Sequence, residues 1–244
     1  MGKVVAVGLG PGDPSQMTAA ADRALRTAEV IAGYSGYVDQ IRGRYPGKEI
    51  LETPMRGEME RCRLALEAAR EGKSVAVICS GDAGIYGMAG LLIEMAGDTE
   101  IEVVPGVTAA ISGAALLGAP LGHDFAVISL SDLLTPWEKI EKRLDLAAEA
   151  DLCMALYNPG SRKRKDYLQR ACRIILRHAA PETVCGVTRN IGRDGESAAV
   201  MSLRELEQEP ADMFMTVFVG NSQTRRIGDR MVTPRGYHLG GQEQ

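Results

Sequence analysis

The sequence predicts an α/β fold built from two α/β domains of similar size. Short apolar runs alternate with helical segments along most of the chain, which is typical of a mainly parallel sheet covered by helices on both faces. Glycine-rich turns directly follow several of these runs. The alternation restarts after Gly118-Ala-Pro-Leu-Gly122, so we expect an N-terminal domain at 1–121 and a C-terminal domain at 122–244.

The first domain is expected to hold the mainly parallel sheet. Val75-Ala-Val-Ile-Cys79 is the kind of unbroken apolar run that a strand covered on both faces requires. The segment 58–71 is clearly amphipathic, and Gly72 is placed to end that helix. The other expected strands are 3–7, 28–33 and 101–104, and the other expected helices are 18–27, a stretch opening at Tyr34, 85–96 and 109–117.

The second domain is expected to hold a mixed sheet. Its strands are predicted at 125–130, 152–157, 183–189 and 213–219, and its helices at 136–149 and 163–178. From about Thr224 onward the pattern is weak, and we expect the Gly/Gln-rich tail to be mobile.

The composition is that of an ordinary soluble globular protein. The 244 residues carry a formal net charge of −4, which argues against a nucleic-acid partner. The 5 cysteines are scattered without a C-x-x-C pair, so we expect neither disulfides nor a metal site, and a reducing cytoplasm fits. No signal peptide is visible and no apolar run approaches about 18 residues, so no membrane partner is expected.

Three loops of the first domain are candidates for ligand binding, at 8–14, 80–87 and 105–109. Each follows a predicted strand, and ligands of open α/β sheets bind beyond the carboxyl ends of the strands. Their side chains are mostly small, which favours recognition by shape and backbone hydrogen bonds over side-chain catalysis. These loops are therefore expected to form one shared pocket.

Polar and basic residues follow the strands of the second domain. They form the segments Tyr157-Asn-Pro159, Ser161-Arg-Lys-Arg-Lys165 and Thr188-Arg-Asn190. The basic run is expected on the first turn of a helix, where the helix dipole disfavours cations. It is either a solvated surface or a set of donors for carboxylates, and Arg189 and Arg193 would reinforce the second interpretation.

Few titratable side chains stand out, and no nucleophile–base pair does. His123, beside Asp124 at the expected boundary, could transfer protons or form an interdomain hydrogen bond. Tyr34, just past a strand, could be a pocket wall or a hydroxyl donor. His178 is most simply a helix C-terminal cap, and His238 lies in the tail.

Together these residues resemble the tetrapyrrole methylase family, whose members transfer methyl groups from S-adenosylmethionine (SAM). The shared motifs are Val7-Gly-Leu-Gly-Pro-Gly-Asp13, Ser80-Gly-Asp82, Pro105-Gly-Val-Thr108 and Val219-Gly-Asn-Ser222. The resemblance spans about residues 4–237 and is closest to the precorrin-3B C-17 and cobalt-factor III methyltransferases of cobalamin biosynthesis. That narrower resemblance rests on 81–90, 122–138, Tyr157-Asn-Pro159 and Thr233-Pro-Arg-Gly-Tyr237.

The resemblance implies a two-domain fold, usually a homodimer, that binds SAM in the cleft between the domains and releases S-adenosylhomocysteine. By position, the cofactor-binding residues would be Pro11, Ser80, Gly81, Asp82, Ile85, Thr108, Ala109, Tyr157, Asn158, Asn190 and Ile191. The substrate would be an anionic tetrapyrrole bearing acetate and propionate groups, with Gly10, Arg162, Lys163, Arg164, Arg189 and Arg193 as its binding residues.

Methyl transfer from a sulfonium needs alignment and a dry pocket more than covalent help from the protein. In the resembled enzymes, C-17 methylation accompanies ring contraction, which also requires proton movement. We expect His123 to serve this step, with Tyr34 and Asp132 as weaker candidates. Another branch of the family places an aspartate after its second strand, and Tyr34 stands there in this sequence, so that role is not transferred.

Three alternatives remain open. One is another SAM-dependent methylase of the same fold acting on protein or RNA. The negative net charge and the specific segments 81–90 and 122–138 disfavour it. A second is a nicotinamide-dependent oxidoreductase, although Asp13 replaces the third glycine of the dinucleotide fingerprint and Pro11 removes a donor. The third is a module that binds its ligand without turnover. The residues do not distinguish a metal-free from a cobalt-bearing substrate.

Overall fold

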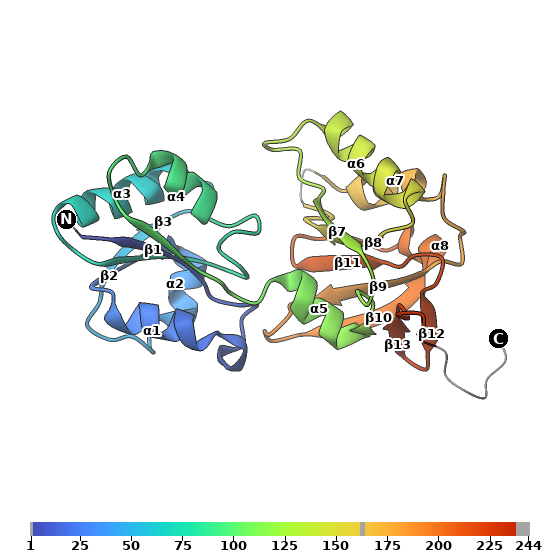
Figure 1. Cartoon of the computed structure of the whole chain (residues 1–244), viewed down its shortest axis with the longest axis horizontal. Helices are drawn as coiled ribbons and strands as arrows, with labels where there is room; N and C mark the ends of the chain where they lie inside the picture. The colour runs from blue at the N-terminus through green and yellow to red at the C-terminus, as the bar shows by residue number, and fades with distance from the viewer. Residues whose placement is uncertain (1, 162–163, 238–244) are drawn as a thin grey trace. The chain divides into compact units, whose positions relative to one another are not determined.

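The computed structural model describes residues 2–161 and 164–237, and the chain divides into two compact units, Met1–Ala109 and Ala110–Gln244 (Figure 1). The division therefore falls at 109/110 rather than at 121/122. The reason is helix α5 (Ala109–Leu117), whose Ala110 and Leu117 pack against Phe218 in the core of the second unit. The expected tail, with His238, lies outside the described residues.

The first unit is built on a five-stranded sheet in the order β3-β2-β4-β1-β5, and every neighbouring pair is parallel. Helices α1 and α2 cover one face of this sheet, and α3 and α4 cover the other (Figure 1). The α/β class is thus confirmed. The elements are β1 (Val4–Gly8), the 3-10 turn η1 (Pro14–Gln16), α1 (Ala19–Thr27), β2 (Val30–Tyr34), α2 (Ser35–Ile41), β3 (Glu49–Thr53), α3 (Glu58–Arg70), β4 (Val75–Cys79), α4 (Ala89–Met95) and β5 (Ile101–Val104).

The central strand β4 shows why its sequence is apolar throughout. Val75 and Val77 point into the core beneath α3 and α4, whereas Ala76 and Ile78 point into the core beneath α1 and α2. Alternate side chains of a strand face opposite sides, so a strand covered on both faces needs apolar residues at every position. The edge strand β3 was not predicted, because only its last residue is fully buried.

The second unit holds a mixed five-stranded sheet in the order β10-β9-β11-β8-β7, as expected. Strands β7 and β8 are parallel, and the remaining pairs are antiparallel. A separate three-stranded sheet has the order β12-β13-β6, and its strands β12 and β13 lie in the region of weak sequence signal. The strands are β6 (Gly118–Ala119), β7 (Phe125–Ser129), β8 (Cys153–Tyr157), β9 (Val184–Arg189), β10 (Ser197–Ser202), β11 (Met215–Val219), β12 (Arg225–Ile227) and β13 (Arg230–Val232).

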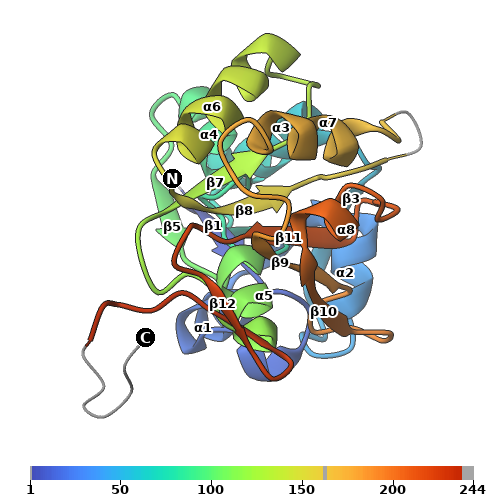
Figure 2. The same ribbon diagram turned by 90° about the vertical axis from the view of Figure 1, so that its right-hand side faces the viewer.

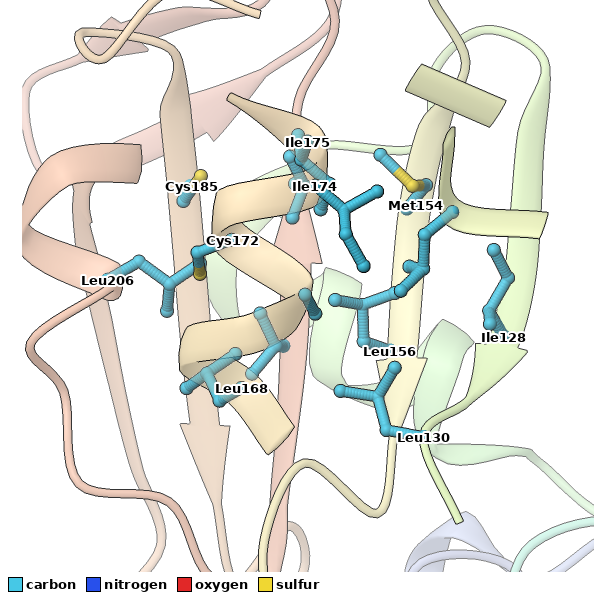
Figure 3. Close-up of a cluster of buried hydrophobic side chains, with 14 of the residues drawn as sticks. Ile128, Leu130, Met154, Leu156, Leu168, Cys172, Ile174, Ile175, Cys185 and Leu206 are labelled. Atoms are coloured by element: carbon cyan, nitrogen blue, oxygen red, sulfur yellow. The ribbon is translucent and has the colours of Figure 1, made fainter. Parts of the chain in front are cut away.

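Helices α6 (Trp137–Glu149), α7 (Tyr167–Ile175) and the short α8 (Leu203–Leu206) cover one face of the mixed sheet, and α5 covers the other (Figure 2). Figure 3 shows the larger core, in which Leu156 of β8 lies beside Leu130, and Cys172 of α7 lies near Leu206. In the described part of the chain, no helix is long and apolar enough to cross a membrane.

Candidate cofactor and substrate site

Three loops at the carboxyl edge of the first sheet come together as the sequence predicts, because β4, β1 and β5 are neighbours. The N–H of Gly10 donates to the carbonyl oxygen of Gly81 at 3.1 Å, and the N–H of Gly81 donates back at 2.8 Å. A Cβ on Gly106 would lie 2.1 Å from the oxygen of Gly81, and one on Gly8 would lie 2.6 Å from the same atom. Only glycine allows the three loops to approach this closely.

The carboxylate of Asp82 joins the loop after β4 to the loop after β5. Its Oδ1 accepts the N–H groups of Gly84 at 2.8 Å and Ile85 at 3.1 Å, and its Oδ2 accepts the N–H of Gly106 at 3.0 Å. Side-chain bonds of this kind compete with helix formation. Helix α4 accordingly begins at Ala89 rather than at the predicted residue 85. The Asp82 side chain thus shapes the loop.

The surface of the 80–87 loop suits a ligand with a flat ring and an apolar chain. Gly81 has a φ of +67°, and a Cβ there would meet nothing closer than 3.7 Å, so open backbone faces outward. Ile85 and Tyr86 on the same loop are 40% and 58% exposed. Glycine backbone offers polar groups to such a ligand, while the exposed apolar side chains offer contact area.

Tyr34 ends β2 at the same carboxyl edge, one strand away from β4. Its ring is half-buried and meets the ring of Tyr37 edge-on, with 5.2 Å between centroids. In the sheet register, Tyr34 pairs with Thr53 of β3. The structure therefore places Tyr34 next to the glycine loops of its own unit.

The candidates in the second unit gather at the carboxyl ends of β8 and β9. The hydroxyl of Tyr157 accepts the N–H of Ala110 at 2.8 Å and so caps the first turn of α5. Asn158 and Asn190 have φ values of +54° and +49°, a left-handed conformation that asparagine adopts more readily than most residues. The Asn158 amide donates to the hydroxyl of Ser129 at 3.0 Å.

Two apolar residues that sequence reasoning missed lie at this same edge. Met213 and Phe214 are exposed just before β11, the strand between β8 and β9. The carbonyl oxygen of Phe214 accepts the N–H of Asn190 at 3.2 Å. Ile191, by contrast, is buried. The sequence carries no signal for Met213 and Phe214, because their exposure depends on strand order.

The basic residues are less available than the sequence suggests. Arg189 donates to Asp212 at 2.8 Å, to Glu209 at 3.0 Å and to the carbonyl oxygen of Pro210 at 2.6 Å. Its guanidinium thus holds acidic residues of its own unit, which disfavours a substrate role. The backbone N–H of Arg193 donates to Asn190 at 2.9 Å, and Arg162 and Lys163 lie outside the described residues.

Asp132 and Arg164 pair with each other. Arg164 Nε donates to Asp132 Oδ1, and the Tyr167 hydroxyl donates to Asp132 Oδ2 at 2.6 Å. Helix α7 begins at Tyr167. The prediction that the basic run lies on the first turn of this helix is therefore wrong, because the run precedes the helix. The hydroxyl of Tyr167 and the guanidinium of Arg164 hold the pKa of Asp132 below its ordinary value. A carboxylate held ionised in this way is a poor base, and its contacts favour a structural role.

We expect Asp132→Asn to weaken the second unit at neutral pH by about 1 kcal/mol. Because the folded-state pKa of Asp132 is lowered, its stabilisation is present above the ordinary carboxyl pKa of about 3.9 and fades as the pH falls through the folded value. Urea titrations should therefore separate the two proteins at pH 7 and much less at pH 3. An equal difference at both values would contradict this assignment.

His123 lies on an exposed turn. Its Nδ1 accepts the N–H of Asp124 at 2.9 Å, so the neutral ring carries its proton on Nε2 and presents a donor there. His178, expected to cap its helix, instead places Nε2 3.0 Å from Oδ1 of Asp145 on α6. Of the two histidines, only His123 presents a ring N–H that none of the described residues accepts.

No nucleophile or metal centre emerges from the described ranges. They contain no group of three or more His, Cys, Asp or Glu side chains that could hold a metal ion. All the cysteines are buried and unpaired with one another. Burial raises the pKa of Cys79, next to the glycine loop, to about 11, so its thiol stays protonated and unreactive at neutral pH.

The chain thus combines an all-parallel sheet, whose glycine loops converge at its carboxyl edge, with a mixed sheet that follows it in sequence. The chain belongs to the tetrapyrrole (corrin/porphyrin) methylases, whose family model matches residues 3–207. It is therefore a methyltransferase.

Individual relatives match almost the whole chain. A probable cobalt-factor III C(17)-methyltransferase of Salmonella typhimurium is 46% identical over 237 residues, which cover 96% of this chain and 98% of the relative. A cobalt-factor III methyltransferase of Priestia megaterium is 43% identical over 97% of this chain but only 45% of the relative. The crystal structure of the methyltransferase CobJ superposes with a TM-score of 0.89 at 40% identity, over 96% of this chain and 100% of that one.

Proposed function

We propose that the protein is a SAM-dependent methyltransferase that methylates C-17 of a precorrin-3B or cobalt-factor III type tetrapyrrole, coupled to ring contraction, in cobalamin biosynthesis. The observation that carries the proposal is the 46% identity to the Salmonella relative, which extends over nearly the full length of both chains. That relative is named for cobalt-factor III, which favours the cobalt-bearing substrate over the metal-free one.

SAM supplies an activated methyl group when bound, and the protein's task is to bind and align it. In this proposal the backbone of Pro11, Ser80 and Gly81, with Ile85, Thr108 and Ala109, holds the cofactor from the first unit, and Gly10 contacts the substrate. The matching residues of the second unit are Tyr157, Asn158, Asn190 and Ile191. Asp82 acts by fixing the loop, as its three backbone hydrogen bonds indicate.

Proton movement during ring contraction is assigned to His123, with Tyr34 as a second candidate. The Nε2 proton of neutral His123 is available for donation because Nδ1 is held by the Asp124 N–H. Of the basic candidates, Arg164 is engaged by Asp132 and Arg189 by its own acidic neighbours, which disfavours both as ligands of the substrate's carboxylates.

We expect His123→Ala to lower turnover by about tenfold to a hundredfold while SAM affinity stays within about twofold of wild type. The matched control is His178→Ala, whose ring is tied to Asp145 and which should turn over normally. Turnover by mass spectrometry and affinity by calorimetry measure the two effects. Wild-type turnover in His123→Ala would remove this residue from the mechanism.

The proposal is tested by titrating the protein with SAM and with NAD, and then incubating it anaerobically with SAM and either cobalt-factor III or precorrin-3B. We expect SAM to bind, NAD not to bind, and one methyl group to be gained on the tetrapyrrole. NAD binding without SAM binding would instead indicate an oxidoreductase. SAM binding without methyl transfer to either tetrapyrrole would indicate a different acceptor or a binding module.

We further propose that the protein works as a homodimer in the cytoplasm, with no nucleic-acid or membrane partner. The resemblance to dimeric methylases and the net charge of −4 support this. Light scattering after size exclusion should give twice the chain mass, and a monomer would contradict it.

A further inference from the structure

A buried arginine lies near the carboxyl edge of the first sheet without an acidic partner. Arg61 of α3 is only 4% exposed. Its Nη1 lies 3.4 Å from the sulfur of Met88, its Nη2 lies 3.5 Å from the carbonyl oxygen of Pro54, and its Nε is buried with no acceptor. No carboxylate within residues 2–161 or 164–237 forms an ion pair with it.

Burying the Arg61 guanidinium among these weak acceptors is energetically unfavourable when no ligand is bound. A guanidinium stays charged at any physiological pH and carries five N–H donors. A thioether sulfur is a weak acceptor, and a carbonyl oxygen at 3.5 Å is at the limit of a hydrogen bond. Burying a charge without a counter-ion is costly, and such charges in proteins are normally paired.

The neighbouring arginine on the same helix shows the contrast. Arg63 is half exposed, and it donates to Glu60 at 2.6 Å and to Glu67 at 2.5 Å. An exposed arginine gains little from such pairs, whereas a buried one needs them. On helix α3, the exposed Arg63 therefore has two acidic partners, whereas the buried Arg61 has none among the described residues.

The position of Arg61 places such an anion beside the cofactor loops. Met88 ends the glycine-rich segment after β4, and Pro54 begins the loop after β3. Thr53, which precedes Pro54, has a hydroxyl that is also buried without a partner. Thr53 pairs in the sheet register with Tyr34, the last residue of β2, and β2 lies between β3 and β4. Arg61 therefore contacts the end of the glycine-rich segment through Met88, and a second unsatisfied polar group, the Thr53 hydroxyl, lies at the carboxyl end of β3.

We propose that Arg61 binds a carboxylate of a bound ligand, with the Thr53 hydroxyl as a second donor. The inference rests on the proposed function, which brings two sources of this group to the edge: the α-carboxylate of SAM and the acetate or propionate groups of the tetrapyrrole. The fork of an arginine suits either, because it can donate two parallel hydrogen bonds to one carboxylate.

The test compares Arg61→Met with the matched control Arg63→Met. Calorimetry gives the affinity for S-adenosylhomocysteine and for its decarboxylated analogue, and an absorbance titration gives the affinity for cobalt-factor III. We expect Arg61→Met to weaken one carboxylate ligand by about tenfold to a hundredfold and Arg63→Met to weaken none. Urea unfolding of ligand-free Arg61→Met should give a stability equal to or above that of wild type, because a lone buried charge is removed.

The pattern of losses identifies the source. Weaker S-adenosylhomocysteine with an unchanged decarboxylated analogue assigns Arg61 to the cofactor carboxylate. Weaker cobalt-factor III with unchanged S-adenosylhomocysteine assigns it to the substrate. Unchanged affinity for all ligands, or equal losses for the acid and its decarboxylated analogue in a destabilised variant, would overturn the inference. These measurements are binding affinities and are independent of the methyl-transfer assay. A negative result in that assay would contradict the proposed function and not the role of Arg61.

Discussion

Gly106→Ala is expected to destabilise the first unit by about 3 kcal/mol and to abolish measurable SAM binding. The added Cβ would lie 2.1 Å from the carbonyl oxygen of Gly81 and 2.6 Å from the carbonyl carbon and oxygen of Gly8. These are backbone atoms of two neighbouring loops that are already bonded to each other through Gly10. They can move away only by opening the place where the three loops meet.

The matched control for this change is Gly90→Ala. A Cβ at Gly90 would meet nothing within 4 Å, and the residue lies inside helix α4. Alanine favours a helix over glycine, so this variant should be as stable as wild type or up to about 1 kcal/mol more stable, with unchanged SAM affinity. Urea titration and calorimetry measure both variants. A Gly106→Ala protein that binds SAM like Gly90→Ala would contradict the loop geometry.

Asp82→Ala is expected to lower stability by about 2–4 kcal/mol and SAM affinity by at least about tenfold. The change leaves the N–H groups of Gly84, Ile85 and Gly106 without their carboxylate acceptor. The loop before α4 would then lose the side-chain hydrogen bonds that stabilise its non-helical conformation. Asp82→Asn should be intermediate, because its amide keeps one acceptor oxygen but turns two N–H donors toward the backbone donors.

A control for Asp82 is available on the surface of the same unit. Asp39 is well exposed and lies 3.6 Å from Arg42, so Asp39→Ala should change stability by less than about 0.5 kcal/mol. Amide hydrogen exchange adds a local readout: exchange at residues 84, 85 and 106 should speed up in Asp82→Ala only. Unchanged protection of these amides would mean that Asp82 does not hold the loops together.

The parts of the fold that follow from apolar pattern could be predicted from sequence. The unbroken apolar run Val75–Cys79 predicts a strand, and both faces of that strand are buried in the structure. Strands β3 and β10 were missed because they are edge strands, and exposure on one side removes the continuous apolar run. The late start of α4 could not be foreseen either, since it depends on a side-chain bond that propensity does not describe.

The candidate site shows the same division. The glycine loops were predictable, because glycine spacing after a strand indicates a backbone-lined pocket. The availability of the basic residues was not: Arg189 meets acidic partners 20 and 23 positions further along the chain. Arg61 carried no signal at all, because an arginine in an amphipathic helix is usually exposed. Only burial in the folded structure distinguishes it from Arg63.

If this protein moves a methyl group from SAM to C-17 of a tetrapyrrole, a label in that methyl group must appear on C-17. The most direct measurement is anaerobic incubation with cobalt-factor III and SAM labelled with carbon-13 in its methyl group, followed by NMR of the purified product. We predict a single labelled methyl signal whose couplings place it on C-17. A labelled methyl on any other ring carbon, or no label in the tetrapyrrole although SAM binds, would contradict the account.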